Sequence, residues 1–397
     1  MNIKKQISRL YLYEVISGLQ IVDTVWVFFL LQRGFSLAQV GIAEGVFHIV
    51  SMCFEIPSGM VSDTIGRRRT LMLAGMVSAF GALFMIISDH FFMILLAMGI
   101  NAVSYNLVSG TREALTYDSL LCAGQEELYL KVASRQDFFY EGLFAFTSLM
   151  SVVTVSLGYQ KAYLLAVLQG ILCTICASLL KEAVVEGRED KKKLSVKAMA
   201  GEVGKHFLDT AAFLKKTPEV AWRMAYSGLV SAAVYVIYML LQDHLVAVGL
   251  EPGFLGIPLL LISLCTMAGA VLAEKSKKVS MRVLYLAGGI AVGIFLTLSG
   301  ADFLAVSVLG AGAAHCISEM IMLRTETENQ KFFSSESRAT MVSAGSMAYS
   351  IFMTVLSPGG GALAEMFSVS GAFALLGLLT AAAGVIMFCR MRYKNEK

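Results

Sequence analysis

The chain has 397 residues, of which 57% are hydrophobic and only 15% are charged, and its mean hydropathy is +0.70. A soluble protein of this length carries about a quarter charged residues, so the composition excludes an ordinary soluble globular protein. The net charge of +3 says little by itself, whereas the distribution of the charges along the chain is informative.

Apolar runs of about 20 residues recur along the whole chain, and each is long enough to cross a bilayer as a helix. The first run follows Lys4, Lys5 and Arg9, as in a signal peptide, but no small-residue cleavage site comes after it, so we expect a span there. Hydropathy and periodicity predict twelve helices, over residues 10–31, 38–60, 70–88, 91–112, 138–157, 162–180, 223–243, 253–273, 281–299, 303–323, 338–357 and 369–389.

The positive charges give the orientation of these helices. With the N-terminus placed in the cytoplasm and the sides alternating, all 32 Lys and Arg residues except Arg33 and Lys161 lie on the cytoplasmic side. Positive charges are concentrated in cytoplasmic loops of membrane proteins. We therefore predict an all-α membrane protein with twelve transmembrane helices and both termini in the cytoplasm.

A polar stretch divides the chain into an N-terminal half, 1–180, a linker, 181–221, and a C-terminal half, 222–397. The linker opens with the charged run Lys181 to Lys193, which we interpret as a solvated tether. Its remainder, Leu194 to Lys216, has helical spacing and is expected to lie on the membrane surface.

The turn between the second and third predicted helices, residues 59–70, is strongly basic. Its pattern, Gly-x-x-x-Asp-x-x-Gly-Arg-Arg, resembles the cytoplasmic signature of the major facilitator superfamily, with Thr64 where a basic residue is usual. The preceding Glu55 to Gly59 and the later segment Ser335 to Gly345 are also similar to that family. The resemblance implies two parallel six-helix halves and transport by alternating access. No cofactor or metal is expected, and the sequence has no His-Glu-x-x-His motif. The segment 138–159 lacks the proline-rich motif common in drug antiporters, which argues against that branch.

The resemblance also implies that this turn works as a cytoplasmic gate, in which Asp63 contacts the start of the eleventh helix near Arg338 and Ala339. The positive end of a helix dipole favours such a carboxylate. Topogenesis alone is the alternative, but it explains neither the acid nor the glycines. The gate residues are Gly59, Asp63, Gly66, Arg67 and Arg68. A degenerate copy of this motif follows the eighth predicted helix, where Glu274 aligns with Asp63 and Lys278 with Arg67.

Ionisable residues inside predicted spans are the candidates for proton coupling, because charges at mid-membrane are costly and normally face a cavity or a partner. Asp23 is the leading candidate, since a carboxyl group in low dielectric takes up a proton more readily than one in water. Glu44 and His48 are four residues apart on one helical face, as are His315 and Glu319. Glu14 is expected to reach the inner interface instead.

Polar side chains on the first, fourth, seventh and tenth helices form stripes, and the resemblance implies that those helices line the central path. The cavity candidates are Gln20, Thr24, Asn101, Tyr105, Arg112, Ser231, Tyr235, Tyr238 and His315. Packing remains the alternative for the histidines and for the Tyr, Ser and Gln stripes, because such side chains also join membrane helices. Arg112 has a second alternative, a structural ion pair with Glu113.

The expected function is secondary transport of a small organic molecule across the cell membrane, here a bacterial inner membrane, by a monomer. No phosphate-binding loop or nucleophile motif is present, so neither an ATP-driven pump nor an enzyme is expected. Proton-coupled efflux of amphipathic compounds is the leading hypothesis, because the cavity stripes are aromatic and weakly charged. Import of a metabolite and a non-transporting receptor are the alternatives. The expected partners are the substrate, protons and the lipid bilayer, with no nucleic acid.

Overall fold

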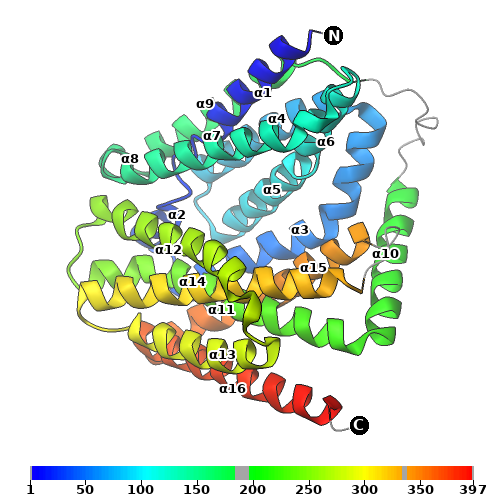
Figure 1. Ribbon diagram of the computed structural model, residues 1–397. Coiled ribbons are helices and arrows are strands. Elements are labelled where there is room, and N and C mark those ends of the chain that lie inside the picture. Colours follow the sequence, from blue (N-terminus) through cyan, green and yellow to red (C-terminus); the bar gives the residue numbers. More distant parts are fainter. Residues whose placement is uncertain (1, 184–195, 333–337, 396–397) are drawn as a thin grey trace. The chain divides into compact units, whose positions relative to one another are not determined.

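The computed structural model describes residues 2–183, 196–332 and 338–395, and in these ranges the chain is helical, with no strand (Figure 1). The α-helices are α1 Ile3–Ser17, α2 Trp26–Gln32, α3 Leu37–Ile65, α4 Arg67–Ile87, α5 Phe91–Val108, α6 Thr111–Leu121, α7 Tyr129–Leu149, α8 Ser151–Leu157, α9 Tyr159–Leu179, α10 Val196–Lys216, α11 Pro218–Ala247, α12 Gly256–Lys275, α13 Met281–Leu298, α14 Leu304–Gln330, α15 Arg338–Met366 and α16 Val369–Asn395.

Ten helices in the described ranges are long and apolar enough to cross a membrane, or eleven if the bent pair formed by residues 126–149 and 151–157 is one span. The predicted all-helical membrane fold is therefore confirmed, whereas the predicted number of twelve is not. The difference lies in the first predicted span, 10–31, because α1 ends at Ser17 and α2 begins only at Trp26. The continuous first helix was therefore a wrong prediction. In the count of ten the difference also lies in the fifth predicted span, 138–157, where the chain bends between α7 and α8. The predicted helix within the linker is present as α10.

The chain forms two compact units. The first contains residues 1–24 and 50–205, and the second contains residues 25–49 and 206–397. In the first unit α4 packs against both α5 and α9. The contact with α9 depends on small residues: a Cβ on Gly75 would lie 2.8 Å from the Gly170 carbonyl oxygen, and a Cβ on Gly170 would lie 2.8 Å from that of Gly75. Paired glycines let the two helix backbones touch.

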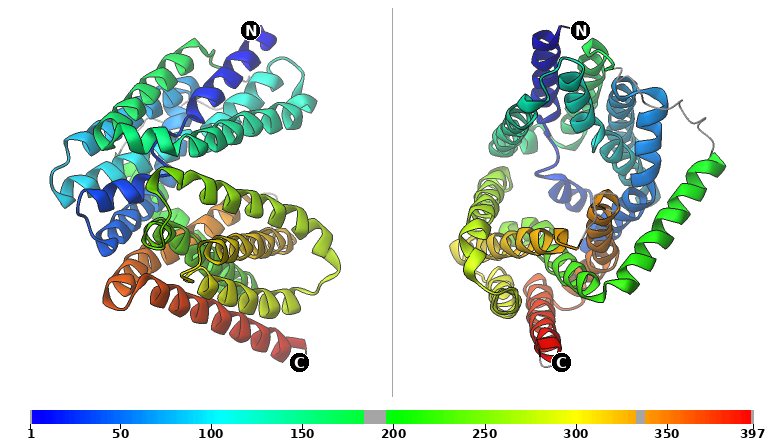
Figure 2. Two further views of the ribbon diagram at one scale, coloured as in Figure 1. Left: turned by 90° about the vertical axis from the view of Figure 1, so that its left-hand side faces the viewer. Right: turned by 45° about the vertical axis from the view of Figure 1, so that its right-hand side comes forward.

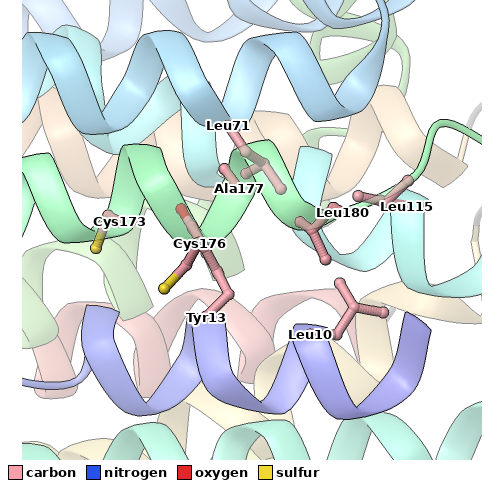
Figure 3. Close-up of a cluster of buried hydrophobic side chains, with 8 residues drawn as sticks. All are labelled: Leu10, Tyr13, Leu71, Leu115, Cys173, Cys176, Ala177 and Leu180. Atoms are coloured by element: carbon pink, nitrogen blue, oxygen red, sulfur yellow. The ribbon is translucent and has the colours of Figure 1, made fainter. Parts of the chain in front are cut away.

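A buried apolar cluster joins α1, α4, α6 and α9 in this unit (Figure 3). It contains Leu10, Tyr13, Leu71, Leu115, Cys173, Cys176, Ala177 and Leu180. Both cysteines are free thiols here, so the Cys-x-x-Cys spacing serves packing in this helix. The cluster fixes the position of α1 and therefore of the polar residues that follow Tyr13.

In the second unit α11 packs against α14, α15 and α16. Of the residues in its 18-residue apolar stretch, 72% are buried. The helices α13 and α16 lie side by side in both views of Figure 2. Small residues again allow the close approach, since a Cβ on Gly289 would lie 3.0 Å from the Gly384 Cα.

The first part of α3 belongs to the second unit and packs antiparallel on the last part of α15. We call this contact the α3–α15 seam, residues 37–48 against residues 349–365. A Cβ on Gly41 would overlap the Ser357 carbonyl group, and one on Gly361 would lie 2.8 Å from the Leu37 carbonyl carbon. Ser357 Oγ donates a hydrogen bond to the Gly41 carbonyl oxygen over 2.9 Å. The two backbones therefore touch along the seam.

Candidate functional site

The interruption between α1 and α2 holds three of the predicted site residues. Gln20 Nε2 donates to the Tyr140 hydroxyl, and Thr24 Oγ1 lies 3.0 Å from Ser148 Oγ, so α7 supports both sides of the break. Asp23 lies between them and is exposed. Within the described residues its carboxylate has neither a hydrogen bond nor an ion pair. Discontinuous helices in membrane transporters leave backbone and side-chain groups free to bind ions or substrate.

Arg112 lies at the centre of a charge network in the first unit, in which the Glu14 side chain is buried while the side chains of Glu113 and Asp137 are 42% and 63% exposed. Its guanidinium contacts Glu14 at 3.1 Å, Glu113 at 2.6 Å and Asp137 at 3.4 Å. Glu14 is completely buried, and its other carboxylate oxygen accepts a hydrogen bond from Gln136 Nε2 over 3.1 Å. The expectation that Glu14 reaches the interface is therefore wrong. Sequence reasoning paired Arg112 with its neighbour Glu113 and missed Glu14, whose partner is 98 positions away.

The remaining candidates in the first unit lie on α5. The Asn101 side chain lies against Gly81 of α4, where a Cβ on that glycine would collide with its amide oxygen. Tyr105 is 59% exposed. Asn101 therefore contributes to helix packing, while more than half of the Tyr105 surface is accessible.

Glu44 and His48 form a buried pair in the second unit. His48 Nε2 lies 3.3 Å from Glu44 Oε1, and the two residues are 8% and 5% exposed. The His48 ring meets the Tyr349 ring of α15 edge to face at 5.3 Å between centroids. The pair therefore lies at one end of the α3–α15 seam.

An aromatic group lines α11 and α14 in the same unit. The rings of Tyr235 and Tyr238 are 6.1 Å apart, and Tyr238 lies 5.5 Å from the His315 ring. His315 Nδ1 lies 2.9 Å from the Ala311 carbonyl oxygen of its own helix. Within the described residues it forms no ion pair with Glu319, which is half-buried, as is Ser231. The spacing of His315 and Glu319 thus does not bring them together here.

The predicted turn of twelve residues is wrong, because residues 59–65 belong to α3 and residues 67–70 to α4, and Gly66 alone separates the two helices. Two carboxylates that sequence reasoning missed organise this basic segment at residues 59–70. Arg67 Nε lies 2.8 Å from Asp118 of α6. The carboxylate of Glu182 accepts the backbone N–H groups of Arg67 at 2.7 Å and Arg68 at 3.0 Å. It therefore caps the N-terminus of α4, where the exposed N–H groups favour an anion.

Gly66 makes this cap possible. Its φ of +96° is a conformation that side-chain-bearing residues rarely adopt, and a Cβ there would lie 2.8 Å from Glu182 Oε2. Arg68 Nη2 donates to the Ser178 carbonyl oxygen over 2.7 Å. Gly59 has open space around it, and Asp63 is exposed. The predicted contact of Asp63 with Arg338 and Ala339 involves side chains that lie outside the described part of the chain.

The corresponding turn after α12 is built with the opposite polarity. Arg324 of α14 donates to the carbonyl oxygens of Ser276 and Val279, the latter over 3.1 Å. Glu274, aligned with Asp63, is exposed and lies 3.5 Å from Lys277 Nζ. In the first unit Arg67, next to the turn, binds an acid of α6. In the second unit Arg324 of α14 binds the carbonyl oxygens of the turn itself.

Comparison with known proteins identifies the family of this helical architecture. The profile described as Major Facilitator Superfamily matches residues 16–326. The chain belongs to the Major Facilitator Superfamily. A facilitator of this kind moves solutes through the membrane, so the chain is a transporter and not an enzyme.

Individual facilitators resemble parts or all of the chain. The Bacillus subtilis (strain 168) protein described as uncharacterized MFS-type transporter YxaM is 29% identical over 108 residues, which is 27% of the length of each protein. Two solved facilitator structures share the fold. The nucleoside transporter NupG has a TM-score of 0.75 at 14% identity, with 100% of both chains covered. A bacterial homolog of the human lysosomal transporter Spinster, in an inward-facing and occupied conformation, has a TM-score of 0.73 at 14% identity, covering 96% of this chain and 94% of that one.

Proposed function

We propose that the chain is a proton-coupled exporter of amphipathic organic compounds, which it moves by alternating access. The two moving parts are the six-helix halves 1–180 and 222–397, joined by the linker 181–221. Both termini face the cytoplasm of a bacterial cell, and the protein works as a monomer in the cell membrane. The family match supports secondary transport. The export direction, the coupling to protons and the amphipathic substrate are proposed here in addition.

The observation that carries the proposal is Asp23 in the break between α1 and α2. A carboxylate within a membrane-spanning segment is costly unless it is protonated or meets a cation. Because the described residues supply Asp23 with no cation, a proton or a cationic group on the cargo is its natural partner. Alternate binding of the two would couple cargo movement to the proton gradient.

The aromatic group of the second unit supports an amphipathic cargo. Tyr235, Tyr238 and His315 offer ring faces and polar edges without a fixed charge. Aromatic side chains of this kind bind large apolar bodies while their polar atoms orient the ligand.

Inverted membrane vesicles test the coupling. A pH gradient is established, a panel of amphipathic cations and neutral compounds is added, and collapse of the gradient is recorded for the parent and for Asp23→Asn. The matched control is Asp302→Asn, since Asp302 is an exposed acid in the loop between α13 and α14. We expect compound-dependent collapse in the parent and the control but not in Asp23→Asn. Equal collapse in all three would remove Asp23 from the coupling mechanism.

Import of a small metabolite is the second candidate. Nucleosides belong in the compound panel because NupG, a nucleoside transporter, shares this fold. Uptake of labelled compound by intact cells that express the protein would favour import, and accumulation in inverted vesicles favours export. Binding without flux in either direction would indicate a receptor.

We propose further that the basic segment at residues 59–70 is a cytoplasmic gate in which Asp63 binds the start of α15. Its exposed carboxylate supports this role, because such a group is available for a contact that forms and breaks. Asp63→Asn is expected to slow transport while the protein still reaches the membrane. Unchanged flux at equal protein abundance would contradict the gate.

A further inference from the structure

Two arginines stack on aromatic rings where α11 and α13 begin and α16 ends. The Arg282 Cζ atom of α13 lies 4.3 Å from the centre of the Phe388 ring of α16, and the Arg390 Cζ atom of α16 lies 4.3 Å from the centre of the Trp222 ring of α11. The helices α13 and α16 lie side by side (Figure 2), so the two stacked pairs are neighbours. We call Trp222, Arg282, Phe388 and Arg390 the arginine–aromatic cluster.

The hydrogen-bond donors of both arginines are unused. Within the described residues neither guanidinium forms a hydrogen bond or an ion pair, and the Nε atom of Arg282 is buried without a partner. A guanidinium that stacks on a ring is covered on its face, while its N–H groups point outward in the plane of the group. Such an edge matches two oxygens of a phosphate group.

Two acids at this end of the unit have other partners. Glu219 of α11 binds Arg223, and the Glu328 carboxylate lies 2.8 Å from Lys331 Nζ. Neither acid is therefore the partner of Arg282 or Arg390, and the positive charge of the cluster stays uncompensated within the described residues.

The position of the cluster along its helices is that of the lipid headgroups. Arg282 is the second residue of the apolar span Met281–Leu298, and Arg390 is the last but one of the span Val369–Met391. Trp222 is 42% exposed, and tryptophan is enriched where a membrane meets water. The chemistry of the cluster thus coincides with the depth at which lipid phosphates lie.

Orientation of the helices by positive charge is the alternative explanation for these arginines. That role requires only a positive charge, which lysine supplies equally well. It explains neither the stacking of both guanidinium groups nor the two aromatic rings that hold them in place.

We infer that the arginine–aromatic cluster binds the phosphate group of an anionic phospholipid. The two guanidinium edges bind the phosphate oxygens. Val283, next to Arg282, and Ile386, two residues before Phe388, are 51% and 58% exposed and contact the acyl chains. Basic pockets between membrane helices bind anionic headgroups in this way. The inference goes beyond the proposed transport function and does not rest on it, because lipid binding is measured without cargo.

The fluorescence of Trp222 tests the inference, because the chain has only two tryptophans. In a Trp26→Phe background Trp222 is the sole tryptophan, and a lipid with brominated acyl chains quenches it on contact. The full-length protein is reconstituted in bilayers that mix phosphatidylglycerol with phosphatidylcholine, with bromine on one lipid at a time. The quenching gives the ratio of the two binding constants at the cluster.

We expect phosphatidylglycerol to bind about 5-fold to about 30-fold more tightly than phosphatidylcholine, which is the preference that one to two basic side chains give at a membrane surface. Arg282→Gln with Arg390→Gln should reduce this preference to less than about twofold. Arg282→Lys with Arg390→Lys keeps the charges but loses the paired donors, so it should retain only part of the preference. Lys4→Ala with Lys5→Ala is the matched control, since it removes the same charge at exposed positions of α1 in the first unit and should leave the preference unchanged.

Equal binding of the two lipids in the parent would overturn the inference, and so would a preference that survives in the Gln variant. A full preference in the Lys variant would also overturn it, because charge alone would then explain the binding. Inorganic phosphate, added at constant ionic strength, separates a lipid from a soluble phosphate. It should leave the preference unchanged, whereas loss of the preference would assign the cluster to a soluble phosphate and contradict the lipid site.

Discussion

Replacing Gly41 with alanine tests whether the α3–α15 seam is as tight as its geometry indicates. The added Cβ would overlap the Ser357 carbonyl group, lying 2.8 Å from its carbon and 3.1 Å from the Pro358 Cα. Ordinary contacts between carbon atoms are about 3.5–4.0 Å, so the two helices must separate by roughly 1 Å. Overpacking of this kind costs about 1–3 kcal/mol, which shifts the ratio of open to closed seam by about 5-fold to about 150-fold.

Spin labels on Ile42→Cys and Met366→Cys, both at exposed positions, give the distance across the seam by pulsed electron paramagnetic resonance and so measure this shift. Gly359→Ala is the matched control, because Gly359 is also on α15 and a Cβ there would meet nothing within 4 Å. Both substitutions gain the same helix propensity, about 1 kcal/mol, so the comparison isolates the clash. We expect a longer distance in Gly41→Ala alone. If Gly41→Ala and Gly359→Ala give the same distance distribution, the seam is not the tight contact argued here.

Two further predictions concern the basic segment at residues 59–70. Asp118→Asn removes the acid from a buried ion pair with Arg67 and should lower the unfolding free energy by about 3–5 kcal/mol, seen as a lower melting temperature in detergent. The double change Asp118→Leu with Arg67→Leu should lower the unfolding free energy by less than Asp118→Asn does, because no charge is left unpaired. An equal loss in both variants would show that the ion pair itself provides the stability. Glu182→Ala removes the cap of α4 and should cost about 1 kcal/mol, with faster hydrogen exchange at the amides of residues 67 and 68, whereas Lys181→Ala should leave that exchange unchanged.

The long apolar helices are predictable because each contains an almost continuous run of hydrophobic residues that is long enough to cross a bilayer. The predicted spans 223–243 and 281–299 correspond to α11 and α13 with shifts of a few residues at most. The linker helix α10 is predictable for a different reason, since its apolar residues recur on one face over five turns. These signals are local, and no distant part of the chain is needed to interpret them.

The break between α1 and α2 could not be predicted in this way. Residues 18–25 contain no proline and lie inside an apolar run, so hydropathy continues through them. What stabilises the break is distant in sequence: Tyr140 and Ser148 bind its side chains, and Gln242 Oε1 accepts the Phe28 N–H group over 3.3 Å. A local pattern cannot indicate partners that are more than one hundred residues away.

The candidate site shows the same division between local and distant information. The pairing of Glu44 with His48 is a four-residue spacing, which a helical wheel displays and the structure contains. By contrast, Glu14 and Asp137, which contact Arg112, come from other helices, and so does Asp118, the partner of Arg67. Glu14 was visible only as an acid in an apolar run, and Asp118 as one in a short polar helix, so their residue types indicated importance but not which arginine they bind.

The cap formed by Glu182 has a consequence for cutting the protein into separately produced fragments. The Gln6 side chain forms two hydrogen bonds with the backbone of Lys181. Its amide nitrogen donates to the Lys181 carbonyl oxygen over 2.9 Å, and its amide oxygen accepts the Lys181 N–H group over 3.0 Å. Residues 181 and 182 are thus hydrogen-bonded to α1 and to the start of α4, although the charge pattern assigns both residues to the tether. An amino-terminal fragment that stops at Leu180 would leave the start of α4 uncapped and Gln6 without its backbone partner. One that extends to Ala183 would keep both, and should be the better choice for reassembly with a complementary fragment.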